Sequence, residues 1–378
     1  MQYRNFGKLG LKVSALGFGC MRLPTLENPG QIDEAKATRM LRYAIDHGVN
    51  YIDTAWPYHQ ENSETIVGKA LGQGYRERVF LATKSPVWRI TKHAEYGEYL
   101  DKQLAKLKTD HLDFYLLHAM NAKRWENCRQ TRVFDFLERA KAQGKIKHIG
   151  FSFHDQLSVF KEIADGYDWD FCQIQYNYMN EEYQAGRAGL HYAAAKGLAV
   201  VIMEPLLGGR LARADSGPFR EIWAKAPREG SPAAWALRWL WHQPEVSLVL
   251  SGMSTMAQVE ENVRLAGETD HTLSPSEMEM VQRAKEHFLA QTKVACTGCK
   301  YCADCPAGIR IDEIFDLYNS AYMYGEREEA RRDYSSLAAR ERDFSRCQDC
   351  GLCEEVCPQN LPVRAHLGDF HREFGPKN

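Results

Sequence analysis

NYIDTA (residues 50–55), VFLATKS (79–85) and LDFYLLH (112–118) are three short runs rich in apolar and β-branched residues. Longer stretches lie between them, SETIVGKALGQG (63–74) and EYGEYLDKQLAKLKT (95–109), and these carry apolar residues at helical spacing. Short apolar runs are typical of strands, whereas apolar residues three and four positions apart are typical of helices. This part of the chain therefore predicts a repeated alternation of strand and helix.

The same alternation extends in both directions along the chain. The further runs that predict strands are VSALGFG (13–19), IKHIGFS (146–152), DFCQIQYN (170–177), AVVIMEP (199–205) and SLVLSGM (247–253). Eight strands, each followed by a helix, within roughly 270 residues predict an α/β fold of the (β/α)8 TIM-barrel type. A doubly wound open sheet is the alternative, but no glycine-rich dinucleotide turn follows the first strand. The opening residues YRNFGKLGLKVS (3–14) predict a hairpin that closes the bottom of the barrel.

Composition and charge narrow the class of protein. With 378 residues, 44% hydrophobic and 26% charged, the chain resembles an ordinary globular protein with room for a large and a small domain. A net charge of −2 gives no indication of a nucleic-acid or anionic-membrane surface. No stretch approaches the roughly 20 apolar residues that cross a bilayer, and the first residues lack the apolar core of a signal peptide. We therefore expect a cytoplasmic protein with neither a nucleic-acid nor a membrane partner.

Polar residues interrupt three consecutive strands where chemistry sits in such barrels, at the carboxyl ends. Asp53 closes the second strand, Lys84 the third and His118 the fourth, and Tyr58 lies in the loop that follows Asp53. Taken singly, each could be a solvated rim residue or a packing residue. Together they place an acid, a base and an imidazole around one phenol, which predicts a catalytic site.

These motifs resemble the aldo-keto reductase family over roughly residues 5–270. The specific pieces are Asp53-Thr54-Ala55 with Tyr58, then Ala82-Thr83-Lys84, then the run from Asp113 to His118. The resemblance implies that hydride passes from a nicotinamide to a carbonyl carbon while Tyr58 protonates the oxygen. It also implies that Lys84 lowers the pKa of the phenol, that Asp53 holds Lys84, and that His118 orients the carbonyl.

The same resemblance implies a set of cofactor contacts for NADP(H) or NAD(H). Ser152 and Gln173 match the carboxamide contacts, Met203 replaces the usual stacking aromatic, and Leu206, Gly209 and Arg210 lie in the loop beside the pyrophosphate. The residues that match the adenosine-phosphate motif are Gly252, Ser254, Gln258, Glu261 and Asn262. Residues 253–255 (MST) carry no positive charge for a 2′-phosphate, which leaves Arg264 as the candidate and the NADP preference open.

The last quarter of the chain contains two cysteine runs. Their cysteines are Cys296, Cys299, Cys302 and Cys305, followed by Cys347, Cys350, Cys353 and Cys357. The second run has the bacterial ferredoxin spacing, in which three thiolates hold one cluster and the fourth crosses to the other. We therefore expect two [4Fe–4S] clusters, one bound by Cys296, Cys299, Cys302 and Cys357 and one by the other four. Structural zinc and a single cluster are the alternatives.

These features predict a barrel over residues 1–290 and a small, mostly helical, ferredoxin-like domain over 291–378. The chain resembles the iron–sulfur branch of the aldo-keto reductases. The leading hypothesis is a nicotinamide-dependent oxidoreductase that interconverts a carbonyl and an alcohol, with clusters in an electron-transfer or structural role. The alternative is an electron-transfer protein whose barrel passes electrons from nicotinamide to the clusters without carbonyl chemistry. The expected partners are a small carbonyl or alcohol substrate and a redox partner protein.

Overall fold

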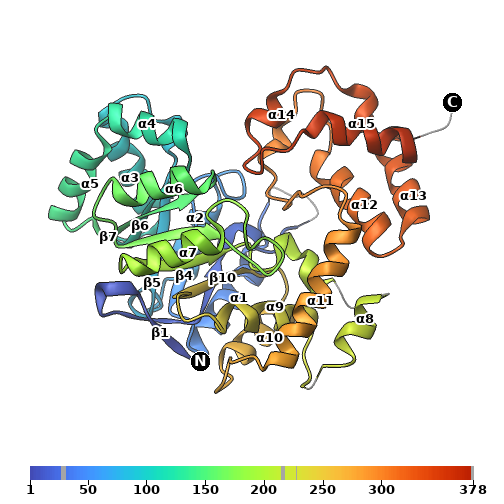
Figure 1. Ribbon diagram of the computed structural model, residues 1–378. Helices are drawn as coiled ribbons and strands as arrows, with labels where there is room; N and C mark the ends of the chain where they lie inside the picture. Colours follow the sequence, from blue (N-terminus) through green and yellow to red (C-terminus); the bar gives the residue numbers. More distant parts are fainter. Residues whose placement is uncertain (27–30, 214–217, 227, 376–378) are drawn as a thin grey trace. The chain divides into compact units, whose positions relative to one another are not determined.

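Eight parallel strands close into a barrel in the computed structural model (Figure 1), which describes residues 1–26, 31–213, 218–226 and 228–375. The strands are β3 (Leu16–Gly19), β4 (Tyr51–Asp53), β5 (Phe80–Ser85), β6 (Leu112–Met120), β7 (Ile146–Phe153), β8 (Phe171–Gln175), β9 (Ala199–Met203) and β10 (Leu248–Gly252). Each strand pairs with the next one along the chain, and β10 pairs with β3 to close the ring. The predicted (β/α)8 barrel is therefore confirmed.

The first predicted strand, 13–19, is two strands in the structure. β2 (Lys12–Ser14) pairs antiparallel with β1 (Tyr3–Asn5), and only β3 joins the barrel. Between β1 and β2, Phe6 packs against the ring of Phe114 at 4.7 Å between centroids. Gly7 follows at a φ of +54°, where a Cβ would lie 2.4 Å from the nitrogen of Ala199, so only glycine fits. The hairpin thus covers the end at which the strands begin, as the sequence predicts.

Helices follow the strands and cover the outside of the barrel. They are α1 (Glu34–Asp46), α2 (Ser63–Ala70), α3 (His93–Leu107), α4 (Ala122–Gln130), α5 (Val133–Ala142), α6 (Leu157–Asp165), α7 (Gly186–Ala195), α9 (Pro232–Trp241) and α10 (Met256–Ala266). In α1 the buried residues recur at three- and four-residue spacing, and Asp33 caps the first turn by accepting from Lys36 N. All nine residues of β6 are buried, as expected of a parallel strand covered on both faces.

Contacts between residues divide the chain into two units. Unit 1 comprises Met1–Pro205 and Leu237–Thr272 and contains every barrel strand, whereas unit 2 comprises Leu206–Ala236 and Leu273–Asn378. The division passes through α9 and places the segment after β9 in unit 2. The predicted domain boundary at 290/291 stays a prediction, because contact units need not coincide with domains.

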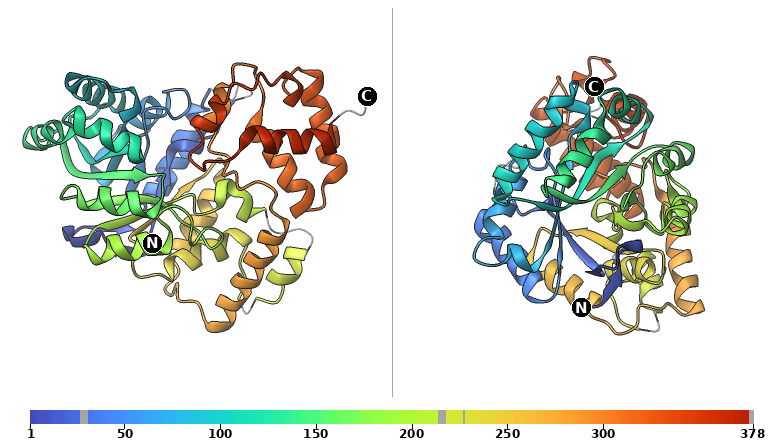
Figure 2. Two further views of the ribbon diagram at one scale, coloured as in Figure 1. Left: turned by 45° about the horizontal axis from the view of Figure 1, so that its top comes forward. Right: turned by 90° about the vertical axis from the view of Figure 1, so that its left-hand side faces the viewer.

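Unit 2 is mostly helical, as predicted. Its helices are α8 (Pro218–Trp223), α11 (Pro275–Gln291), α12 (Ile311–Met323), α13 (Arg327–Ala339), α14 (Leu352–Glu355) and α15 (Val363–Phe374). α12, α13 and α15, orange to red in Figure 2, pack against one another around Ile314, Tyr334 and Phe370. Five cysteines lie partly buried against this core, and Cys296 is buried within it.

Candidate functional site

A buried ion pair lies at the carboxyl ends of β4 and β5. Lys84 Nζ donates to Asp53 Oδ1 at 2.6 Å and to the main-chain oxygen of Thr54 at 2.8 Å. The Lys84 side chain is 0% exposed and that of Asp53 is 3% exposed. Burial lowers the pKa of Lys84 and raises the pKa of Asp53, and each charge opposes the shift of the other. The polypeptide thus supplies both the buried cation, Lys84, and its counter-ion, Asp53.

A second buried carboxylate, Glu64 in α2, supports the strand that carries Lys84. Thr83 Oγ1 and Gln103 Nε2 both donate to Glu64 Oε1 at 2.7 Å. Gln103 Nε2 also donates to the main-chain oxygen of Lys84 at 3.0 Å. Sequence reasoning missed this network, because Glu64 and Gln103 are ordinary polar residues of two helices until the fold buries them.

The Tyr58 ring lies close to both Lys84 and His118. Lys84 Nζ is 5.1 Å from the ring centroid, and the rings of Tyr58 and His118 meet edge to face at 5.9 Å. Burial raises the pKa of Tyr58 well above its ordinary value, and Asp53 adds to the increase. The sequence predicts the opposite direction. The difference has a physical reason, because Asp53 neutralises Lys84 at 2.6 Å and so cancels much of its field at the phenol.

His118 lies where β6 loses its regular register. The pairing of β6 with β7 is interrupted between Leu117 and Met120, and Ala119 has a φ of +53°. Burial lowers the pKa of His118 well below its ordinary value, with a further contribution from Lys84, so the imidazole is neutral near pH 7. Its Nδ1 is buried and has no hydrogen-bond partner among the described residues. A neutral imidazole can donate one hydrogen bond to a substrate oxygen.

The three residues predicted to contact the nicotinamide come from the next three strands. Ser152 Oγ in β7 accepts from Ala119 N at 2.7 Å, which leaves its own hydrogen to donate. Gln173 Nε2 in β8 donates to Met203 Sδ in β9 at 3.7 Å. Gln173 Oε1 is buried without a partner in the described part of the chain. Both Ser152 and Gln173 thus keep a polar group available for a ligand.

Gln175, which sequence reasoning missed, belongs with this group. It is the last residue of β8, two positions beyond Gln173, so both side chains leave the same face of the strand. Both polar atoms of its amide are buried and have no partner within the described ranges. Because buried polar groups are normally hydrogen-bonded, Gln175 is a candidate ligand contact. The sequence could have indicated Gln175, because it repeats the glutamine of position 173 two residues later, on the same face of the strand.

The predicted adenosine-phosphate residues form the start of α10. Gln258 Oε1 accepts from Ser254 N at 2.8 Å and from Thr255 N at 3.2 Å, as part of a capping box. Asn262 Nδ2 donates to Ser251 Oγ at 3.0 Å in a buried contact. The remaining two residues differ in exposure, since Glu261 is half-buried and Gly252 is exposed. Gln258 and Asn262 therefore shape this turn through bonds within the chain.

The basic residue beside this turn is Arg22, which sequence reasoning did not single out. Ser254 Oγ donates to the main-chain oxygen of Arg22 at 2.8 Å. A Cβ at Gly252 would lie 3.2 Å from Arg22 Cβ, so the two residues are in contact. Arg264, the predicted candidate, has Nη1 3.6 Å from Oε1 of Glu268, which lies just beyond the end of the same helix. The barrel topology could have indicated Arg22, because β3 and β10 are neighbours in a closed barrel and the residues that follow them lie close together.

The predicted pyrophosphate residues Leu206, Gly209 and Arg210 lie in unit 2. The chain turns sharply here, with Gly208 at a φ of +70° and Gly209 at +100°. Arg210 is buried and contacts the segment before the first cysteine run, where its Nη1 lies 3.5 Å from the oxygen of Val294.

Six of the eight cysteines form two groups in their mutual electrostatic influence. The charge of Cys357 acts on Cys296 and on Cys302, and Cys296 acts on Cys302. The charges of Cys305 and Cys347 act on Cys353. Burial raises the pKa of Cys302 to about 12, and it also raises the pKa of Cys296 and of Cys353. The last cysteine of each run thus lies near the other run, as the ferredoxin crossing requires.

The local backbone also fits cluster binding. Gly298 N donates to Cys296 Sγ at 3.4 Å. Within the runs, Gly298 and Lys300 have φ values of +66° and +65°, and Asp349 and Gly351 have +54° and +76°. Such turns aim N–H groups at anionic sulfur. No three ligand-type side chains in the described residues converge on a point that would hold one metal ion. Runs of four cysteines at this spacing are the donors that a [4Fe–4S] cluster takes, so the residues present fit such a cluster.

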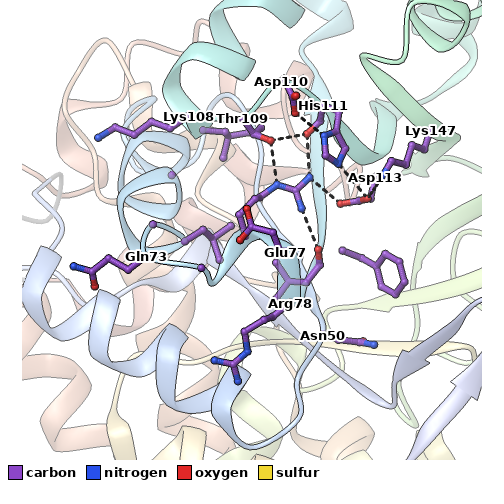
Figure 3. Close-up of a pocket in the computed structure, with 18 residues that line it drawn as sticks. Asn50, Gln73, Glu77, Arg78, Lys108, Thr109, Asp110, His111, Asp113 and Lys147 are labelled. Atoms are coloured by element: carbon purple, nitrogen blue, oxygen red, sulfur yellow. Dashed lines mark hydrogen bonds and ion pairs between the residues drawn. The ribbon is translucent and has the colours of Figure 1, made fainter.

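A separate pocket of about 740 Å³ lies at the other end of the barrel, where β5, β6 and β7 begin (Figure 3). Asp113 organises it, with Arg76 Nη2 at 2.9 Å and Lys147 Nζ at 2.9 Å. Arg76 also donates to Thr109 Oγ1 at 3.1 Å and to the main-chain oxygen of His111 at 3.0 Å. The central charges are paired with one another, as expected of the face of a barrel that serves stability.

Comparison with known proteins identifies both parts of the chain. Residues 15–286 match the model of the aldo/keto reductase family, and residues 295–361 match a 4Fe-4S dicluster domain. The uncharacterized oxidoreductase YqkF of Bacillus subtilis is 30% identical over 70% of this chain and 91% of its own length. The L-galactose dehydrogenase of Arabidopsis thaliana is 29% identical over 71% of this chain and 89% of its own length.

Solved structures show the same barrel. The holo form of an aldo-keto reductase from Bacillus halodurans superposes with a TM-score of 0.63 at 27% identity, over 75% of this chain and 96% of that one. An aldo-keto reductase from Klebsiella pneumoniae in complex with NADPH gives 0.62 at 26% identity, over 75% and 95% of the two chains. Among the described residues, no helix has the length and apolar character needed to span a membrane.

Proposed function

This chain belongs to the aldo/keto reductase family, and we propose that its barrel site interconverts a carbonyl and an alcohol with a nicotinamide dinucleotide. The observation that carries the proposal is the contact of the Tyr58 ring with both the buried Lys84–Asp53 pair and the neutral His118. A phenol, an ammonium and an imidazole around one point can bind and protonate a carbonyl oxygen.

The nicotinamide, when bound, supplies or accepts the hydride, and the chain handles the proton. Because burial raises the pKa of Tyr58, the phenol keeps its proton near pH 7 and donates it only to a strong base. The alkoxide formed from a carbonyl is such a base. His118 donates a hydrogen bond to the same oxygen, and Asp53 fixes Lys84 beside the phenol. Tyr58, His118 and Lys84 then interact most strongly with the negative charge that develops on the carbonyl oxygen during reduction.

The cofactor contacts belong to the same proposal. Ser152, Gln173 and Gln175 have polar groups that could hold the carboxamide, and Met203 could contact the ring. Arg22 offers a positive charge beside Gly252 and Ser254 for a 2′-phosphate, which supports NADP(H) alongside NAD(H). The Klebsiella pneumoniae relative, whose structure contains NADPH, adds support. The small-molecule substrate is a carbonyl or alcohol compound.

For the cysteine region we propose two [4Fe–4S] clusters, in the ligand sets that the mutual influence of the thiols supports. Hydride carries two electrons whereas each cluster accepts one, so the clusters serve structure or exchange electrons with a redox partner protein. The proposed use of eight cysteines as metal ligands, in place of disulfides, supports the cytoplasm as its location.

Tyr58→Phe tests the carbonyl chemistry. The substitution keeps the ring and removes the hydroxyl, so the fold and dinucleotide affinity should persist. The kcat of carbonyl reduction should fall by about 10²–10⁴, the usual contribution of general acid catalysis. The anaerobic full-length protein is assayed with NADPH and NADH on a panel of aldehydes and ketones. Turnover at the wild-type rate in this variant would remove the proposed role, and cluster reduction by NADPH without carbonyl turnover would favour the electron-transfer alternative.

A further inference from the structure

In the part of the chain that the structure describes, the Arg210 guanidinium is a buried cation with no close carboxylate. The side chain is 7% exposed, and its nearest acidic group among the described residues is Asp316, with Nε 3.9 Å from Oδ1. That carboxylate is itself 50% exposed. The remaining contact is neutral, since Nη1 lies 3.5 Å from the main-chain oxygen of Val294.

A buried charge is normally paired, because an isolated ion loses its hydration without compensation. At 3.9 Å from a half-exposed carboxylate, the charge of Arg210 is only weakly compensated by the chain. Two bound anions could compensate the charge of Arg210. One is the pyrophosphate of a dinucleotide, and the other is a cluster with four thiolate ligands, which carries net negative charge.

The surroundings of Arg210 favour the cluster. Val294 precedes Cys296 by two residues, and Asn319 of α12 holds it with Nδ2 2.8 Å from its oxygen and Oδ1 3.0 Å from its nitrogen. The same oxygen faces Arg210. The main chain of Arg210 is held too, since Tyr324 Oη donates to its oxygen at 3.1 Å. The side chain of Arg210 therefore contacts the segment that leads into the first cysteine run, and its backbone is held by the residue that caps the end of α12.

We propose that Arg210 is the counter-ion of the cluster bound by Cys296, Cys299, Cys302 and Cys357, and that it positions the start of the first cysteine run. The proposal rests on the two-cluster assignment above. Reduction of this cluster by one electron from an external reductant, such as dithionite, adds one negative charge. A neighbouring guanidinium stabilises the reduced state more than the oxidised state and so raises the midpoint potential.

The test is a redox titration of anaerobic full-length protein followed by electron paramagnetic resonance. Arg210→Met should shift the reduction equilibrium of one cluster about tenfold toward the oxidised form, which lowers its midpoint potential by about 59 mV for one electron. The other cluster should keep its potential. Arg210→Lys retains the positive charge and should keep both potentials near those of the wild type.

Arg213→Met is the matched control. Arg213 is on the same loop and pairs with the same Asp316 at 3.1 Å, but its side chain is 45% exposed and pairs with Glu326 as well. Solvent screens such a charge, so this variant should leave both midpoint potentials unchanged.

The competing assignment is tested on the same proteins by titration with 2′-phospho-ADP-ribose, a dinucleotide fragment that cannot exchange electrons. Unchanged potentials in Arg210→Met, with tenfold or greater loss of affinity for this fragment, would overturn the proposal and assign Arg210 to the pyrophosphate. If Arg210→Met loses iron, Arg210→Lys decides, because a lowered potential in that variant at full iron content would also overturn it. Carbonyl turnover enters none of these measurements, so they stand or fall independently of the barrel chemistry.

Discussion

The two regions of this protein bury positive charge in different ways. In the barrel, Lys84 has Asp53 at 2.6 Å and a main-chain oxygen at 2.8 Å. In unit 2, the contacts of the Arg210 side chain among the described residues are a half-exposed carboxylate at 3.9 Å and a main-chain oxygen at 3.5 Å. Both side chains are nearly inaccessible to solvent. The charge of Lys84 is thus compensated within the polypeptide, whereas the charge of Arg210 is only weakly compensated and could be paired by a bound anion.

The same contrast extends to the neighbouring groups. Asp53, Lys84 and Glu64 form buried bonds with one another or with adjacent polar groups. In unit 2, the charges of neighbouring cysteines influence one another. Among the described residues, however, these side chains do not converge on a point that a single metal ion would occupy. A preformed ion pair is rigid before substrate binds, whereas a cysteine region acquires its final order from the metal that it binds.

Removing Lys84 should have the largest effect, because the barrel depends on its own ion pair. Lys84→Met leaves Asp53 buried without a partner, which should cost about 3–5 kcal/mol of unfolding free energy. Carbonyl reduction should fall as well, because the ammonium that lies beside the phenol is lost. The measurements are urea unfolding and kcat. The double variant Asp53→Asn/Lys84→Met, which buries neither charge, should recover much of the stability and none of the activity. Equal stability of the single and double variants would break the contrast between the regions.

Removing one crossing cysteine should affect one cluster. Anaerobic wild-type protein should contain about eight irons and eight sulfides, and Cys357→Ser should retain about four of each. The control is Cys128→Ser, a buried cysteine outside both runs, which should keep the full content. Chemical analysis of iron and acid-labile sulfide provides the measurement. Four irons in the wild type would indicate a single cluster, and zinc without sulfide would contradict the assignment altogether.

Arg22 should make a smaller difference. We expect a preference for NADPH over NADH of about tenfold, since one charge-assisted contact contributes roughly 1.5–3 kcal/mol and Arg22 is partly solvated. Arg22→Met should abolish the preference in kcat/KM, whereas Arg264→Met, which removes a partner of Glu268 only, should leave it unchanged. If Arg264→Met abolished the preference and Arg22→Met kept it, Arg264 would be the residue that contacts the 2′-phosphate.

The smallest expected effect is that of pH. A proton donor acts in carbonyl reduction while it is protonated, so the rate falls as pH rises through its pKa. Burial raises the pKa of Tyr58 well above 10.0, and burial lowers the pKa of His118 well below 6.5. Neither Tyr58 nor His118 should therefore cause a decline in the kcat of reduction between about pH 6.5 and about pH 10. A decline centred near pH 7 to 8 would mean that Lys84 lowers the pKa of the phenol after all.

Sequence reasoning located the strand ends that carry Asp53, Lys84 and His118, because apolar runs mark strands and polar residues interrupt them at their ends. It misjudged the first strand, since Lys12–Ser14 pairs in the hairpin and only Leu16–Gly19 enters the barrel. Both segments have the same local pattern, and only the pairing partner distinguishes them. Gln175 was overlooked for a similar reason, because its amide is unusual only once it is buried without a partner.

The amino-acid sequence by itself determined the alternation of strand and helix and the spacing of the eight cysteines. Both are local properties, since the backbone repeat of a strand or helix and the span of a Cys-x2-Cys turn extend over a few residues. Only the tertiary structure decided that burial and Asp53 raise the pKa of Tyr58, that Arg22 lies beside Ser254, and that Arg210 lies with the first cysteine run. Those properties depend on which distant groups share a buried space. Electrostatic energy in such a space depends on distance and solvent exclusion, which no local pattern specifies.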